Sequence, residues 1–209
     1  MSAYIYIEGG ASGPNNDGSS SKYLTIACQK AFHSLLAKMG FTERQPRLVP
    51  CGGRGKVYDR FCIEHATGKA SYAAMLLDAE EPMANIEQAW KHLAEVRTVP
   101  AWSRPESAED EQVLFMTTCM ETWVATDRVT LRAHYGQKLN ENPLPALPNI
   151  ENRSREAVFL ALVTATRDCL NGYAKGKRSS EVLEKLNPVV LRQHLPSFVR
   201  VERILKTKL

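Results

Sequence analysis

The chain has 209 residues, 44% of them hydrophobic and 24% charged, which suits one medium-sized globular protein with a proper core. It contains no apolar run near the ~20 residues that cross a bilayer, and the apolar run at residues 4–7 is too short for a secretory signal. These features exclude a membrane span and predict a cytoplasmic protein. No two of the five cysteines are separated by only two residues, which predicts reduced thiols rather than a zinc ribbon or a disulfide framework.

Short apolar runs alternate with helical patterns in the first two thirds of the chain. The predicted strands are residues 3–7, 48–51, 73–77 and 113–116, and the predicted helices are residues 21–39, 57–65, 86–96 and 120–134. A proline-containing linker at residues 140–149 is followed only by helical patterns, at residues 155–170, 180–186 and 188–205. This order predicts an α/β domain with a mostly parallel sheet at residues 1–139 and a helical C-terminal extension packed on it at residues 140–209.

The net charge of +4 is unevenly distributed. Residues 173–209 contain nine Lys or Arg and three Asp or Glu, so this segment carries +6 and the rest of the chain carries −2. A basic segment beside a less basic body favours a polyanionic partner. The glycine-rich segment at residues 9–13 lacks the Gly-Lys-Ser/Thr ending of a P-loop, so ATP hydrolysis by this chain is not expected.

Acidic residues follow three of the predicted strands. Glu8 follows the first strand, Asp78 and Glu80 follow the third, and Glu121 lies shortly after the fourth. Ligands of parallel sheets bind beyond the carboxyl ends of the strands, so Glu8, Asp78 and Glu80 are expected to meet at one edge of the sheet if the first and third strands are neighbours. In an extended segment, residues 78 and 80 point the same way, and Mg²⁺ prefers carboxylate oxygens. Taken singly, each acid could instead cap a helix or begin a loop.

Four short motifs extend this pattern along the chain. They are Ile7-Glu8-Gly9, Asp78-Ala79-Glu80, Met120-Glu121-Thr122-Trp123 and Tyr173-Ala174-Lys175-Gly176. In this order, they resemble the strand-Glu-Gly, Asp-x-Glu, Met-Glu-x-Trp and Tyr-x-Lys-Gly segments of an uncharacterised bacterial Toprim-like family, a domain of unknown function. That family is related to the Toprim domains of overcoming-lysogenization-defect nucleases.

The resemblance implies a Toprim-like sheet and metal-dependent hydrolysis of nucleic-acid phosphodiesters. It implies that Glu8, Asp78 and Glu80 bind Mg²⁺ or Mn²⁺, that Glu121 adds a further ligand, and that Lys175 offsets the charge of the phosphorane. It also implies an anti-phage defence effector that works beside a separate ATPase. Many Toprim nucleases carry another acid at the position of Ser12, so the number of ions stays open.

Two basic groups are the predicted nucleic-acid contacts. They are Arg54, Lys56 and Arg60 after the second strand, and Lys175, Lys177 and Arg178 in a glycine-containing loop. The first group could instead pair with surface acids, and the second could form a solvated loop. The alternatives to a nuclease are a non-catalytic Mg-binding interaction subunit of a defence complex and another phosphoryl-transfer enzyme. DNA or RNA, and endonuclease or exonuclease cleavage, are open at this point.

Overall fold

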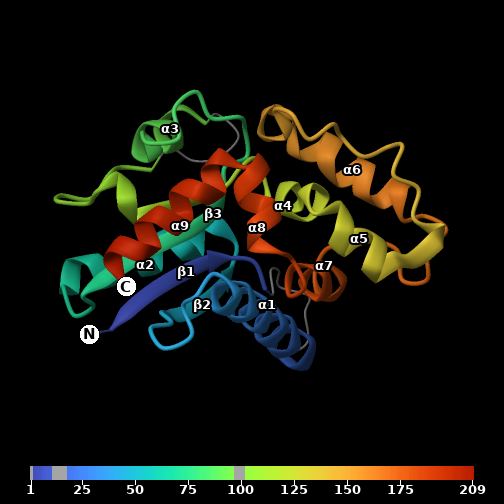
Figure 1. Cartoon of the computed structure of the whole chain (residues 1–209). Coiled ribbons are helices and arrows are strands. Elements are labelled where there is room, and N and C mark those ends of the chain that lie inside the picture. Colours follow the sequence, from blue (N-terminus) through green and yellow to red (C-terminus); the bar gives the residue numbers. More distant parts are fainter. Residues whose placement is uncertain (1, 11–17, 97–101) are drawn as a thin grey trace.

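The computed structural model describes residues 2–10, 18–96 and 102–209 of the chain (Figure 1). Its four strands are β1 (Ala3–Glu8), β2 (Arg47–Gly52), β3 (Tyr72–Asp78) and β4 (Val113–Met116). They form one sheet in the order β2-β1-β3-β4, and every pairing is parallel. The prediction of an α/β protein with a parallel sheet flanked by helices is therefore confirmed.

The helices of the described residues are α1 (Gly18–Lys38), α2 (Arg54–Thr67), α3 (Ala89–Glu95), α4 (Met120–Thr126), α5 (Arg128–Tyr135), α6 (Arg155–Ala165), α7 (Lys177–Leu183), α8 (Pro188–His194) and α9 (Pro196–Lys208). Two predicted helices are each divided in two. Asp127 ends α4 and caps α5 by accepting a hydrogen bond from the backbone N–H of Thr130. Pro196 begins α9, because proline lacks an N–H and disfavours a helical conformation at Leu195 before it.

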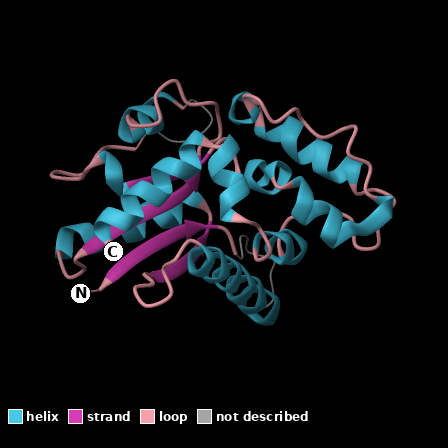
Figure 2. Ribbon diagram, in the orientation of Figure 1, coloured by secondary structure: helices cyan, strands magenta, loops and turns pink. Residues whose placement is uncertain are grey.

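Helices cover both faces of the sheet (Figure 2), and the side chains of the strands alternate between two hydrophobic cores. One face of the sheet, which includes Ile7 and Leu76, packs against α1 and α9. The opposite face, which includes Met75 and Phe115, packs against α2 and α3. A parallel sheet that is covered on both sides needs strands that are apolar throughout, which is why the predicted strands are continuous apolar runs.

The C-terminal helices complete the first core. Helix α9 lies across one face of the sheet and buries Phe198 there, with the ring edge-on to that of Trp123 at 5.0 Å between centroids (Figure 1). Helices α4 to α8 group beyond the carboxyl ends of the strands (Figure 1). The two predicted parts of the chain therefore share one hydrophobic core. Among the described helices, none is both long enough and apolar enough to cross a membrane.

Candidate functional site

Three acidic side chains meet at the carboxyl end of the sheet. Strands β1 and β3 are parallel neighbours and end in Glu8 and Asp78. The backbone N–H of Asp78 donates to Glu8 Oε2 at 3.2 Å, and Asp78 Oδ1 accepts from the backbone N–H of Met120 at 2.8 Å. The next residue, Glu121, lies in the first turn of α4 and is only 3% exposed. The structure therefore brings Glu8 and Asp78 together as predicted, and Glu121, rather than the predicted Glu80, lines the same cavity of about 390 Å³ with them.

The surroundings of Asp78 and Glu8 disfavour the ionised forms of these two carboxylates. Burial and the charges of Glu8 and Glu121 raise the pKa of Asp78 from 3.8 to about 8. Burial also raises the pKa of Glu8, although the charge of Arg54 opposes that change. A cluster of acids with raised pKa values in a cleft is typical of a functional site, since stability alone would not select it.

The loop before α7 brings Tyr173 and Lys175 to these acids. The buried Tyr173 hydroxyl donates to Glu121 Oε1 at 3.3 Å, and its backbone N–H donates to Thr166 Oγ1 at 2.7 Å. This anchoring places Lys175 in the wall of the same cavity, 5.4 Å from the ring centroid of Phe159. Two motifs that lie some fifty residues apart in the sequence, around Glu121 and Tyr173, are thus in direct contact.

The other cations of that loop lie outside the cavity. Lys177 pairs with Glu181 at 3.7 Å and lies over the ring of Tyr23, and Arg178 donates to the carbonyl of Gly172. Of the three predicted contacts in this loop, the structure therefore brings Lys175 alone to the acids.

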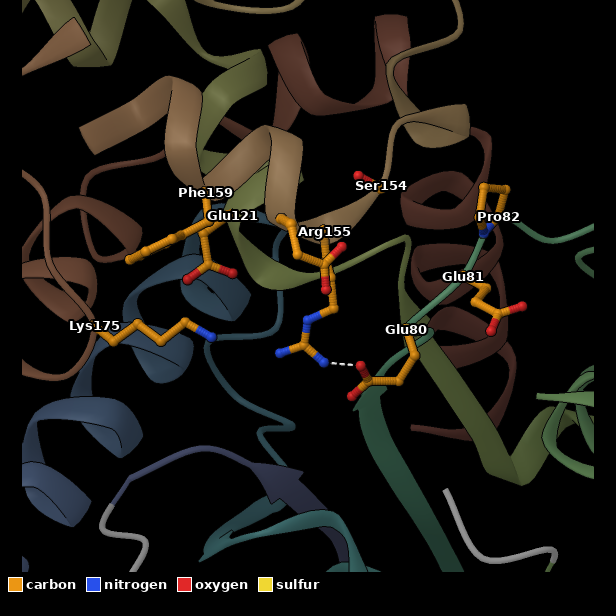
Figure 3. A pocket seen from close by; sticks show the side chains of 9 residues that line it. Glu80, Glu81, Pro82, Glu121, Ser154, Arg155, Phe159 and Lys175 are labelled. Carbon is orange, nitrogen blue, oxygen red and sulfur yellow. Dashed lines mark ion pairs between the residues drawn. The ribbon is translucent and has the colours of Figure 1, made fainter. Parts of the chain in front are cut away.

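Glu80 takes a different position from the predicted one. Strand β3 ends at Asp78, and Glu80 has a φ of 70°, so the extended geometry expected for residues 78–80 is wrong. The reason is that the backbone N–H of Glu80 donates to the carbonyl of Thr118, which turns the chain away from the strand direction. Its carboxylate, 10% exposed, pairs with Arg155 (Figure 3) and also with Arg54 at 3.3 Å.

Arg54 begins α2 and is the innermost cation of the site. Its side chain is 11% exposed, and its guanidinium lies 4.9 Å from the ring centroid of Trp102. Trp102 in turn stacks on Tyr58 at 4.6 Å between centroids. Within the described part of the chain, its three guanidinium nitrogens form an ion pair but no hydrogen bond. Burial lowers the pKa of Arg54, whereas the charges of Glu8 and Asp78 raise it.

The remaining predicted cations of this group, Lys56 and Arg60, are exposed on α2 and do not line the cavity. Sequence reasoning missed Arg155 and Phe159 as neighbours of the acids, and Trp102 as a neighbour of Arg54. A helix start at residue 155 was predictable, and Ser154 does cap α6 by accepting from Ala157 N–H. Nothing in the local sequence indicates that this end of the helix points at the sheet.

Residues 15–206 match a protein family described as "Domain of unknown function (DUF4276)". The chain belongs to this family. No curated protein and no solved structure matches it. The description of DUF4276 names no activity, so the relation to Toprim domains and nucleases stays a prediction.

The acids of this DUF4276 chain fit a divalent cation in their chemistry. Glu8, Asp78 and Glu121 offer the hard oxygens that Mg²⁺ prefers, and a cation would relieve their mutual repulsion. Among residues 2–10, 18–96 and 102–209, however, no three His, Cys, Asp or Glu side chains lie close enough together to hold a metal ion. Binding would therefore require these three carboxylates to approach one another. Glu80 fits less well, because both its oxygens face arginines.

The basic C-terminal segment is largely used inside the molecule. Arg200, which is 3% exposed, and Arg203 both pair with Glu87, while Lys208 pairs with Glu109 and Glu111. These contacts tie α9 to acids of the α/β part. Three of the nine basic residues of the segment are therefore engaged with the α/β part, and a polyanionic partner for the remaining charge stays a prediction.

Proposed function

We propose that this protein is a divalent-cation-dependent nuclease that hydrolyses nucleic-acid phosphodiesters. The observation that carries the proposal is the convergence of Glu8, Asp78 and Glu121 from three chain segments into one cleft that also contains Arg155 and Lys175. Carboxylates that repel one another beside cations are an arrangement suited to binding a metal ion together with a phosphate. The resemblance of the four sequence motifs to a Toprim-like family supports the same activity.

Each side chain has a role in this proposal. Glu8, Asp78 and Glu121 would hold Mg²⁺ or Mn²⁺, which polarises a phosphate and lowers the pKa of water when it is bound. Arg155 and Lys175 would bind the phosphate and offset the negative charge that develops as the bond to phosphorus forms. Tyr173 keeps one oxygen of Glu121 in a hydrogen bond and so fixes the orientation of that carboxylate.

The charge of the cleft supports dependence on a cation. Two adjoining cavities, which share Glu121, Arg155 and Lys175, are lined by six carboxylates and two cations. A phosphodiester would meet net repulsion in such a cleft, because like charges repel strongly where solvent is partly excluded. A bound divalent cation would reverse that balance near Asp78.

The test is cleavage of plasmid DNA, linear duplex, single-stranded DNA and tRNA in Mg²⁺ or Mn²⁺. We expect cleavage that EDTA abolishes and that Asp78→Asn lowers by at least about 100-fold. Asp59→Asn is the matched control, because Asp59 is an exposed acid of α2 that does not line the cavity. Cleavage that persists in EDTA, or that Asp78→Asn leaves unchanged, would refute the proposal.

Two observations favour a second candidate, a non-catalytic interaction subunit. Arginines already neutralise Glu80, and the described acids are too far apart to hold a metal as they stand. A folded protein that binds Mn²⁺ in calorimetry but cleaves none of the substrates would support this candidate. The separate ATPase and the role in anti-phage defence are parts of the proposal that rest on the resemblance alone.

A further inference from the structure

A second cavity, of about 590 Å³, opens beside the three acids and is not explained by metal or phosphate binding alone. Its lining residues are Glu80, Glu81, Pro82, Glu121, Ser154, Arg155, Glu156, Phe159 and Lys175. In Figure 3, Phe159 and Lys175 border one side of this cavity and Glu81 and Pro82 the other, with the guanidinium of Arg155 between them. Its volume falls in the range of about 300 to 1,000 Å³ that is usual for small-ligand sites.

We infer that this cavity receives an unpaired nucleobase, stacked on Phe159, so that the substrate is a single-stranded or locally unpaired nucleic acid. The inference rests on the proposed nuclease function, since it places the base next to the acids that would act on the adjoining phosphodiester. A paired base cannot reach such a cavity, because it is held in the stack of its duplex.

Phe159 provides a fixed aromatic surface. It lies one helical turn after Arg155 on α6, so the ring and the guanidinium project from the same face of the helix. The ring is partly exposed, and the buried ring of Tyr173 contacts it at 6.2 Å between centroids and an angle of 66°. Stacking on aromatic side chains is how proteins bind single strands without strong sequence preference, since every base has a π-face.

The charged residues around the Phe159 ring favour the base on one side of the cavity and the phosphate on the other. Glu81 and Glu156 are exposed at the cavity and form no ion pair with the residues that the structure describes. Their carboxylates would repel a phosphate, but they can accept hydrogen bonds from the exocyclic amino group of a base. Arg155 and Lys175 lie between this region and the acids, where they can hold the phosphate attached to the stacked nucleotide.

The test measures the Kd of fluorescently labelled single-stranded DNA and RNA oligonucleotides by anisotropy. Ca²⁺ replaces Mg²⁺ in the assay, because it carries the same charge and also prefers oxygen ligands. Phe159→Leu keeps an apolar side chain in the partly buried position and removes the aromatic face. We expect it to weaken binding by about 5- to 150-fold. Phe159→Trp should bind as the wild type does.

Two controls separate stacking from loss of structure. Leu160→Ala changes the next residue, which is 65% exposed and does not line the cavity, and should leave the Kd unchanged. A strand without bases should bind the wild type as weakly as the normal strand binds Phe159→Leu. Thermal melting of each variant confirms that it is folded.

The results also separate this inference from the proposed function. Equal affinity of the wild type and Phe159→Leu, equal affinity for normal and abasic strands, or no binding of either single strand would overturn the inference. Cleavage in Mg²⁺ is scored separately. A single strand that binds through Phe159 but is never cleaved would refute the nuclease function and support the base site. Cleavage that Phe159→Leu does not affect would support the nuclease function and refute the base site.

Discussion

The two walls of the cleft come from different parts of the chain and carry different charges. The α/β part supplies Glu8, Asp78 and Glu121 from the ends of strands and the start of α4, whereas the C-terminal helical segment supplies Arg155 and Lys175. Ionised acids are unfavourable in this cleft, because burial and then the charges of Glu8 and Glu121 raise the pKa of Asp78. The cations of the helical segment partly offset that cost, so the site is complete only where the two parts meet.

This difference has a consequence for variants of each wall. Removing an acid should relieve repulsion and stabilise the protein while it abolishes activity, because functional sites often store such unfavourable contacts. Removing a cation should lower activity and stability together. An acid of the cleft whose removal destabilises the protein at neutral pH would therefore contradict this difference between the two walls.

The largest effect on stability is expected for Asp78→Asn. Because the pKa of Asp78 is raised in the folded state, its protonated form stabilises the fold at low pH. That stability is lost as the pH rises from 3.8, the ordinary pKa of the group, to about 8. Asparagine carries no charge and can still accept from Met120 N–H. Because Asp78 keeps some contact with solvent, we expect a gain of about 2 kcal/mol at pH 8, or roughly 4 to 8 °C in Tm.

Thermal melting in EDTA from pH 4 to pH 8 measures this change. The wild type and Asp78→Asn should coincide at the acid end and diverge as the pH rises. A variant that is less stable than the wild type at pH 8 would show that the acids do not oppose one another. Added Mn²⁺ should raise the Tm of the wild type and narrow its difference from the Tm of Asp78→Asn, since a ligand that binds the folded state stabilises that state.

The next largest effect concerns the two lysines of one loop. Lys175→Ala should lower kcat by about 100-fold, because its charge lies in the wall of the cleft where the phosphate would bind. Lys177→Ala should change kcat/KM by less than about twofold, since Lys177 is exposed and paired with Glu181 on the surface. Equal losses in both variants would mean that only the total positive charge of the loop matters.

Arg155 joins the two walls through its ion pair with Glu80. Arg155 is 27% exposed and Glu80 would keep its pair with Arg54, so Arg155→Gln should cost about 1 kcal/mol of the free energy of unfolding. Urea denaturation measures this loss of unfolding free energy. Arg153→Gln is the control, because the side chain of Arg153 is exposed. If both variants were equally stable, the ion pair would contribute nothing to holding α6 at the sheet.

The smallest effect is expected at the hydrogen bond between Tyr173 and Glu121. Tyr173→Phe removes the donor that orients Glu121, and we expect Mn²⁺ affinity to fall by about 10-fold in a calorimetric titration. Tyr135→Phe is the control, because the buried Tyr135 hydroxyl has no hydrogen-bond partner within the described residues. A merely structural role for Tyr173 would lower the Tm and leave the metal affinity unchanged.

The acidic strand ends of this site could be predicted, because they follow from residues that are adjacent in the sequence. An apolar run followed by an acid gives a strand that ends at a carboxylate, as in β1 with Glu8 and β3 with Asp78. Alternation of strands and helices then favours a parallel sheet, which brings strand ends to one edge. The same reasoning failed at Glu80, where the turn depends on a hydrogen bond to Thr118, which is distant in the sequence. At Asp127 it missed a local signal, because the cap of α5 accepts from Thr130 only three residues further on.

The sequence by itself therefore determined the parallel sheet and two of its acidic strand ends, since both follow from hydrophobic pattern and chain order. Only the tertiary structure decided which cations face those acids. Arg155 reaches the cleft because α6 packs against α4, and Lys175 does so because Tyr173 bonds to Glu121. Three basic residues of α9, Arg200, Arg203 and Lys208, instead form ion pairs with acids of the α/β part. The physical reason is that a charge acts over a few ångströms, and such distances between remote residues are set by packing.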